Sequence, residues 1–91
     1  MKNVQGLRKR TGKLPHRGDG KTLQLESVRK GDEVLVFHDD GSDISVRIDI
    51  CQEEGVLIGT VLKVGGKPPG ISRDDEIAFH EDFVFVITKR P

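Results

Sequence analysis

The clearest hydrophobic pattern in the chain is the strict alternation of residues 44–51, which read ISVRIDIC. Ile44, Val46, Ile48 and Ile50 take one set of alternate positions, and mostly polar residues take the other. Successive side chains of a β-strand point to opposite faces, so a period of two predicts a strand with one buried and one solvated face. We therefore expect these four aliphatic side chains to share the face of a sheet that packs on the core.

The remaining apolar segments are also short and rich in β-branched and aromatic residues. They are residues 33–38, 56–64, 76–80 and 83–88, with a first strand expected near Thr22 and turns at 39–43, 52–55 and 65–70. Segment 56–64 is apolar on both faces, which predicts a central strand, and Gly59 within it predicts a bulge or bend. No segment has helical periodicity. The sequence predicts an all-β fold, a small antiparallel barrel or strongly curled sheet of about five or six strands, SH3-like in size.

Two segments of the chain repeat one pattern. Residues 28–40 read VRKGDEVLVFHDD, and residues 71–82 read ISRDDEIAFHED. One interpretation is a metal-binding or hydrolytic site with His38, Asp39, His80 and Asp82 as candidate ligands, since histidine and carboxylates bind zinc. The other is a structural solution used twice, in which a strand begins after a polar turn and ends at a His-acid pair. We favour the second interpretation, and if Phe37 and Phe79 face the core, the adjacent histidines face solvent.

Charge divides the chain into two unequal parts. Residues 1–21 hold seven basic residues against one acidic residue, or +6, and residues 22–91 hold eight against fourteen, or −6. The first part has few apolar residues and no periodicity, so it cannot bury enough surface to offset its ordering entropy. We predict a basic tail of residues 1–21, disordered in isolation, and a single domain of residues 22–91. Because the two charges attract, the tail could also fold back on its own domain.

Two segments are candidates for binding a partner. The basic residues of the tail, which could neutralise phosphates of a nucleic acid or contact an acidic protein, are Arg8, Lys9, Arg10, Lys13 and Arg17. The loop GGKPPG offers Lys67, Pro68 and Pro69 on a segment stiffened by two prolines. The sequence favours a non-enzymatic binding or accessory module for a protein or nucleic acid. The rival hypothesis is a metal-binding or hydrolytic protein that uses His38, His80 and nearby carboxylates.

Other functional classes find little support in the sequence. A single cysteine, Cys51, cannot form an internal disulfide, and the acidic residues beside it would raise its thiol pKa and make it a poor nucleophile. No apolar run approaches the roughly 20 residues of a membrane span, and no signal peptide is visible. We expect a cytosolic, bacterial protein without a cofactor or a membrane association, as a monomer or weak dimer.

The order of the predicted strands resembles that of small bacterial β domains of unknown function. The likeness covers residues 28–88 and rests on "KGDEV", "ISVRIDI", "GVLIGTV", a Pro-Gly loop and the closing "DDEIAFHEDFVFVI". Where the pattern has Gly before the Asp of the last turn, this chain has Asp74. The resemblance implies a small β-barrel domain and transfers no catalytic residue.

Overall fold

The computed structural model describes residues 2–10, 14–18, 21–25 and 28–91, with side chains for residues 3–10 and 28–91. Its strands are β1 (Lys2–Asn3), β2 (Leu14–Gly18), β3 (Lys21–Leu25), β4 (Glu33–Phe37), β5 (Asp43–Cys51), β6 (Val56–Gly65), β7 (Glu76–His80) and β8 (Val86–Lys89). Two short 3₁₀ turns, η1 (Glu53–Gly55) and η2 (Glu81–Phe83), follow β5 and β7. The part of the chain described here contains no α-helix.

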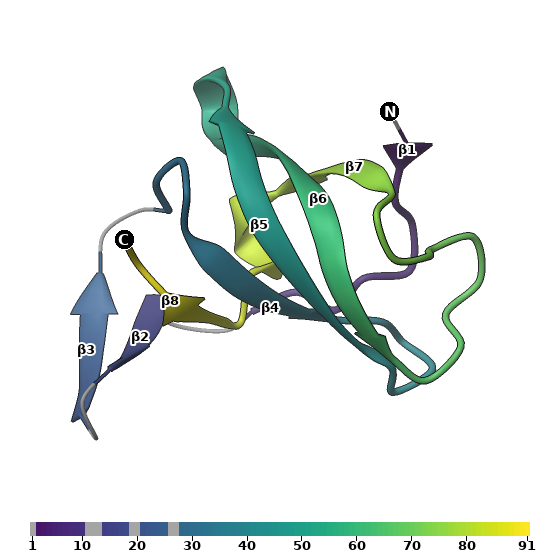
Figure 1. Cartoon of the computed structure of the whole chain (residues 1–91), viewed down its shortest axis with the longest axis horizontal. Coiled ribbons are helices and arrows are strands. Elements are labelled where there is room, and N and C mark those ends of the chain that lie inside the picture. The colour runs from purple at the N-terminus through teal and green to yellow at the C-terminus, as the bar shows by residue number, and fades with distance from the viewer. Residues whose placement is uncertain (1, 11–13, 19–20, 26–27) are drawn as a thin grey trace.

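All the strands belong to one sheet, in the order β1-β7-β6-β5-β4-β8-β2-β3. Strands β4 to β7 form an antiparallel meander, and β8 returns to pair with β4 in the antiparallel sense. Figure 1 shows β5 and β6 as the long central hairpin of this curled sheet. The predicted all-β fold is confirmed. Of the two forms expected, the curled sheet is present rather than the barrel, because the strand order ends at β1 and β3 and does not close.

Residues 2–10 form a segment that we call the N-terminal strap. It begins as β1, parallel to β7, and continues to the end of β4, where Leu7 bridges to His38. The Arg8 N–H donates to the Phe37 carbonyl at 2.8 Å, and Leu7 is buried in the core cluster. In Figure 1 the strap starts beside β7 and crosses toward the side where β2 and β8 lie.

The strap and the β2–β3 hairpin fall largely in the segment expected to be a tail. The hairpin joins the sheet through β2, which lies parallel to β8. The strap lies on the acidic domain, as opposite charges would favour. The division into a tail of residues 1–21 and a domain of residues 22–91 stays a prediction.

The core is built from the inward positions of the meander. Its fully buried side chains include Val34, Val36, Ile44, Val46, Ile48, Leu57, Val61, Ile77, Val84 and Ile87. The predicted alternation in β5 is confirmed as far as Ile48. The prediction is wrong for Ile50, which is 50% exposed, because the β5–β6 register shifts between Ile48 and Ile50 and changes the phase of the alternation.

Gly59 lies at this register shift. It pairs with Ile48, and a Cβ atom at this position would lie 2.5 Å from the Arg47 carbonyl oxygen. Only glycine permits so close an approach of two backbones, so the irregularity predicted at this position is confirmed.

The first copy of the repeat opens with a turn closed by an aspartate. The Asp32 N–H donates to the Arg29 carbonyl at 3.1 Å, and the Arg29 N–H donates to Asp32 Oδ2 at 2.8 Å. The turn also joins the adjacent strand, since the Gly31 N–H donates to the Ile48 carbonyl and the Ile48 N–H donates to the Asp32 carbonyl.

The second copy opens with the same set of bonds. Asp75 and Ser72 exchange the equivalent pair at 3.1 and 2.8 Å, with Asp74 in the position of Gly31. The Asp74 N–H donates to the Val61 carbonyl, and the Val61 N–H donates to the Asp75 carbonyl. The opening turn of the repeat is therefore one architecture built twice, on β5 and on β6, as the structural interpretation predicted.

Candidate functional site

His38, at the end of the first copy, is a buried residue. Its side chain is 11% exposed, whereas the neighbouring Phe37 is partly exposed. The Asp40 N–H donates to His38 Nδ1 at 3.2 Å, and Asp40 Oδ1 lies 3.2 Å from the same nitrogen. The strap passes over the ring, because a Cβ at Gly6 would lie 2.6 Å from His38 Nε2. We expected His38 to face solvent if Phe37 faced the core, and that condition is not met, since Phe37 takes the outward position and His38 the inward one.

His80, at the end of the second copy, makes the equivalent local bond in a more open place. The Asp82 N–H donates to His80 Nδ1 at 3.1 Å, and His80 Nε2 lies 2.8 Å from the Glu54 carbonyl oxygen. In the tautomer whose Nδ1 accepts this hydrogen bond, the Nε2–H group donates a hydrogen bond to that carbonyl. The His80 side chain is 41% exposed and Phe79 is buried, so the expectation is confirmed for this copy.

The four predicted metal ligands, His38, Asp39, His80 and Asp82, do not come together as one group. Among the residues whose positions are described, no three histidine, cysteine or carboxylate side chains form a group that could hold a metal ion. His38 and His80 each use Nδ1 for a backbone N–H, and each lies beside one carboxylate, from Asp40 or Asp82. Asp39 is exposed, and its N–H donates to the Gly6 carbonyl.

The pKa shifts in this region follow from local hydrogen bonds and burial. Hydrogen bonds from the side chain and backbone of Ser42, and then the proximity of His38, lower the pKa of the Asp40 carboxyl. Desolvation raises the pKa of the Cys51 thiol, and the charges of Asp32 and Glu81 raise it further. A thiol with a raised pKa is mostly protonated at neutral pH, as the sequence led us to expect, and is a poor nucleophile.

The predicted basic residues of the strap are directed toward the domain. Arg8 Nη2 donates to the Asp39 carbonyl at 3.3 Å, and Lys9 Nζ lies 3.8 Å from Asp82 Oδ2. The partly buried Arg10 guanidinium donates to the carbonyls of Glu81 and Val84 at 3.0 and 2.6 Å. Lys13 lies outside the described residues, and Arg17 is placed in β2 without a description of its side chain. These contacts attach the strap to the sheet.

The predicted loop lies at the rim of a groove. Lys67 and Pro69 are exposed, whereas Pro68 is buried and anchors the loop. The groove has a volume of about 560 Å³ and is lined by Asn3, Val4, Gln5, Pro69, Gly70 and Ile71. Two segments far apart in the sequence therefore form its two walls, and every lining residue is uncharged.

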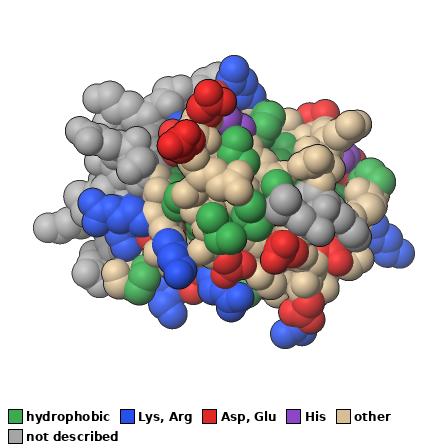
Figure 2. All heavy atoms as spheres, turned by 90° about the horizontal axis from the view of Figure 1, so that it is seen from above, with side chains coloured by type: hydrophobic (Ala, Val, Ile, Leu, Met, Phe, Trp, Pro, Cys, Tyr) green, Lys and Arg blue, Asp and Glu red, His purple; other side chains and the backbone are tan. Residues whose placement is uncertain are grey.

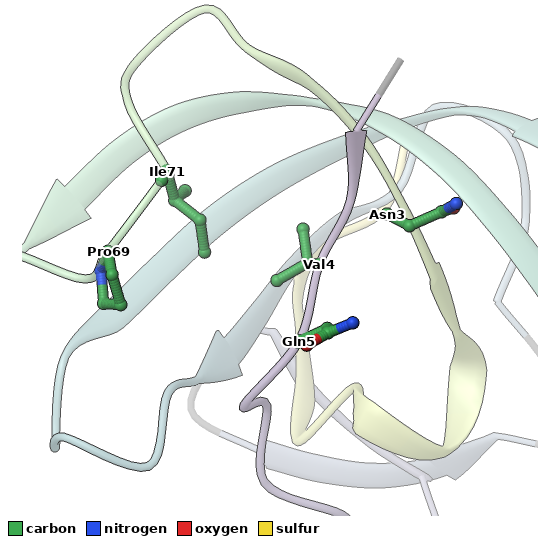
Figure 3. A pocket seen from close by; sticks show the side chains of 6 residues that line it. Asn3, Val4, Gln5, Pro69 and Ile71 are labelled. Atoms are coloured by element: carbon green, nitrogen blue, oxygen red, sulfur yellow. The ribbon is translucent and has the colours of Figure 1, made fainter.

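The floor of the groove is apolar. Figure 3 shows Val4 and Ile71 projecting toward one another from the two walls. Ile71 belongs to the buried core cluster, and Val4 packs against that cluster. On the loop side, a Cβ atom at Gly70 would meet no atom within 4 Å outside the two adjacent residues.

Sequence reasoning identified the loop wall and missed the strap wall. Asn3, Val4 and Gln5 lie in a short basic segment without periodicity, which gives no strand signal. The available signal was the isolated pair Val4 and Leu7, two aliphatic residues in an otherwise polar stretch. Both pack on the core.

One face of the molecule carries charges of both signs. Figure 2 shows that acidic and basic side chains are interspersed on this face, with hydrophobic side chains reaching the surface between them. The described part of this face therefore differs from the continuous basic surface that is typical of nucleic acid binding.

Comparison with known proteins does not identify the chain. No family model, no curated protein and no solved structure matches it. Within the described ranges, the structure has no helix that is long and apolar enough to cross a membrane. Inference about function therefore rests on the geometry of the molecule.

Proposed function

We propose that this protein is a cytosolic, non-enzymatic binding module that holds a protein partner in the groove between the strap and the GGKPPG loop. The observation that carries the proposal is the groove itself, an uncharged depression with two walls from distant segments and an apolar floor. Sites of this kind, mostly apolar and largely preformed, are typical of ligand and peptide binding.

The rigidity of the two walls supports a binding role. The loop is fixed by the buried Pro68 and by Ile71 in the core. The strap is fixed by Leu7 and by its backbone bonds to β4, including the Asp39 N–H that donates to the Gly6 carbonyl at 2.8 Å. A preformed site loses little conformational entropy on binding, which favours affinity.

The charges favour a protein over a nucleic acid. Affinity for nucleic acid comes mainly from neutralising phosphates with Lys and Arg, and none of the six residues that line the groove is charged. Arg8, Lys9 and Arg10 direct their cationic groups to carbonyls and a carboxylate of the domain. A phosphate backbone would have to compete for these groups.

A pair of variants tests the proposal. Twelve-residue peptides are selected by display on the full-length chain, and their affinities are measured by fluorescence anisotropy for wild type, Pro69→Glu and Ser72→Glu. Pro69 lines the groove, so an unpaired carboxylate there should weaken binding about tenfold or more. Ser72 is exposed, lies two residues after the loop and does not line the groove, so the matched charge change there should leave the affinity unchanged.

Two results would contradict this function. Equal affinities for the two variants would place the peptide elsewhere on the molecule. Tighter binding of a mixed-sequence oligonucleotide at physiological salt, lost on deletion of residues 1–21, would favour the nucleic acid alternative, because phosphate contacts give a steep salt dependence.

A further inference from the structure

The partner of the groove can be described more closely from the backbone of the strap. We infer that it is an extended peptide that adds a strand to the free edge of β1 and places an apolar side chain between Val4 and Ile71. The inference rests on the proposed function, since it names the class of partner for the same groove.

The backbone N–H and C=O groups of Asn3 point away from β7, toward the outer edge of β1. The Val4 N–H donates to the Ala78 carbonyl at 3.4 Å, so Val4 directs its amide toward β7. Neighbouring residues of a strand direct their N–H and C=O groups to opposite edges, and the groups of Asn3 therefore face away from β7. β1 is the last strand at this end of the sheet, so that edge carries no strand of the described sheet.

The extended course of the strap carries this edge along the groove. In Figure 3 the side chains of Asn3 and Gln5 point in one direction and that of Val4 in the other, which is the alternation of a strand. The backbone groups of Gln5 therefore face the same edge as those of Asn3. Three residues of strand span roughly 10 Å, enough to pair with three or four residues of a peptide.

Unpaired backbone donors and acceptors at a sheet edge favour a partner that supplies the complementary groups. An extended peptide supplies them at the same spacing, which is the basis of recognition by strand addition. The apolar floor then selects one side chain of the peptide. Val4 and Ile71 project into the groove from opposite walls, and the groove volume of about 560 Å³ is large enough to admit a side chain.

The charge of the loop and of the residues that follow it adds a second preference for the partner. Residues 65–73 include Lys67 and Arg73 and no acidic residue. Both side chains are exposed, and neither takes part in an ion pair with any residue whose side chain is described. A peptide that carries acidic residues beside its apolar residue complements this charge, whereas a basic peptide does not.

The probes are acetylated, amidated heptapeptides that alternate threonine and valine around a central valine and carry glutamate at both ends. Two further forms carry N-methyl groups, one at the odd positions and one at the even positions. An N-methyl group removes a backbone donor and blocks one edge of the peptide without changing its side chains. Affinity for the full-length chain is measured by titration calorimetry.

Strand addition uses one edge of the peptide only. We expect one N-methylated form to bind about tenfold more weakly, because two backbone bonds are lost, and the other to bind like the parent. Equal affinities for the two methylated forms would overturn strand addition. Failure of every heptapeptide to bind, while peptides selected by display bind and are weakened by Pro69→Glu, would also overturn it and leave the proposed function standing.

The charge preference is tested by reversal. Heptapeptides with lysine at both ends should bind wild type more weakly than those with glutamate, and Lys67→Glu should reduce or reverse that preference. Lys63→Glu, on an exposed residue of β6 outside the lining of the groove, is the matched control. A preference that responds equally to both variants would reflect overall charge and would overturn this part of the inference.

Discussion

The two copies of the repeat share the same local structure but bury opposite members of their Phe-His pair. Each opens with an aspartate-closed turn and ends with a histidine whose Nδ1 accepts the N–H two residues ahead. The first copy buries His38 and leaves Phe37 partly exposed, whereas the second buries Phe79 and leaves His80 partly exposed.

The difference follows from the number of residues between the aspartate that opens each copy and the histidine that ends it. Five residues separate Asp32 from His38, and four separate Asp75 from His80. Since side chains alternate in a strand, one extra residue moves the histidine to the other face. Local chemistry thus fixes the ends of each copy, and the spacing between the ends decides which side chain enters the core.

Deleting Leu35 makes the spacing of the first copy equal to that of the second. Either Val34 or Val36, both fully buried, would then turn outward, or His38 would leave its position under the strap. We expect a loss of most of the free energy of unfolding, which is about 5 kcal/mol for a small domain. Urea denaturation followed by circular dichroism measures it, and a loss below about 1 kcal/mol would contradict the role given to spacing.

The two turn aspartates should differ strongly in their contributions. Asp32 is fully buried and accepts two bonds from Arg90, at 3.0 and 2.8 Å, in addition to the Arg29 N–H. Asp32→Ala removes the carboxylate that accepts both of these guanidinium bonds and should cost about 4 kcal/mol. Asp75→Ala removes the bond to the Ser72 N–H in a more exposed turn and should cost about 1 kcal/mol. Equal losses in urea denaturation would show that the buried ion pair adds nothing.

A matched pair of glycines tests the burial of the two histidines. Gly6 and Gly55 have φ angles of +78° and +77°, and at each a Cβ would lie 2.6 Å from Nε2 of the facing histidine, His38 or His80. The backbone strain of alanine is the same at both sites, about 1–2 kcal/mol.

The difference in destabilisation between the two alanine variants shows how freely the imidazole rings of His38 and His80 can move. Gly6→Ala must displace a buried ring and should cost about 3 kcal/mol, whereas Gly55→Ala displaces a partly exposed ring and should cost about 2 kcal/mol. Thermal unfolding of the two variants compares them directly. A larger effect at Gly55 would contradict the assignment of His38 as the constrained histidine.

Asp74 occupies the position that Gly31 takes in the first copy. Its φ angle is +71°, a region that costs energy for a residue with a Cβ. Asp74→Gly should therefore stabilise the domain by about 0.5–1 kcal/mol, and Gly31→Ala should destabilise it, because a Cβ there would also lie 3.1 Å from Pro91 Cγ. Chemical denaturation of both variants tests this, and destabilisation by Asp74→Gly would refute it.

The smallest expected effect is a pH dependence in the turn after His38. The pKa of Asp40 is lowered in the folded chain by hydrogen bonds from Ser42, so the folded state binds the proton less readily than the unfolded state does. This contribution is present above the unfolded pKa, about 3.9, and is lost as the pH falls through the lower folded pKa. Urea midpoints between pH 5 and 2 should fall less steeply for Asp40→Asn than for Asp39→Asn, and equal slopes would contradict the shift.

The sequence contained enough information to predict the β4–β7 meander, but little to predict the strap and the β2–β3 hairpin that join it. Residues 44–48 and Gly59 behaved as their pattern indicated, because alternation and close packing are local constraints. Ile50 did not, because a register shift between two strands depends on both of them. The burial of His38 likewise depends on the strap, which lies about thirty residues away in the sequence.

For the same reason, the sequence predicted only one of the two walls of the candidate site. The loop with Pro68 and Pro69 is distinctive in composition, and it does form one wall of the groove. The other wall is the residue run from Asn3 to Gln5, whose position is set by parallel pairing with β7. Parallel pairing of a two-residue strand leaves no period in the sequence.

In the function proposed here, the strap and the loop form one binding surface. The most direct test is an amide NMR titration of the full-length chain with a peptide selected by display. We predict that the amide signals of Asn3, Val4, Gln5, Gly70 and Ile71 shift together with one dissociation constant, while those of Asp40 and Asp82 do not shift. Shifts confined to another surface, or to residues 8–10 with nucleic acid alone, would contradict it.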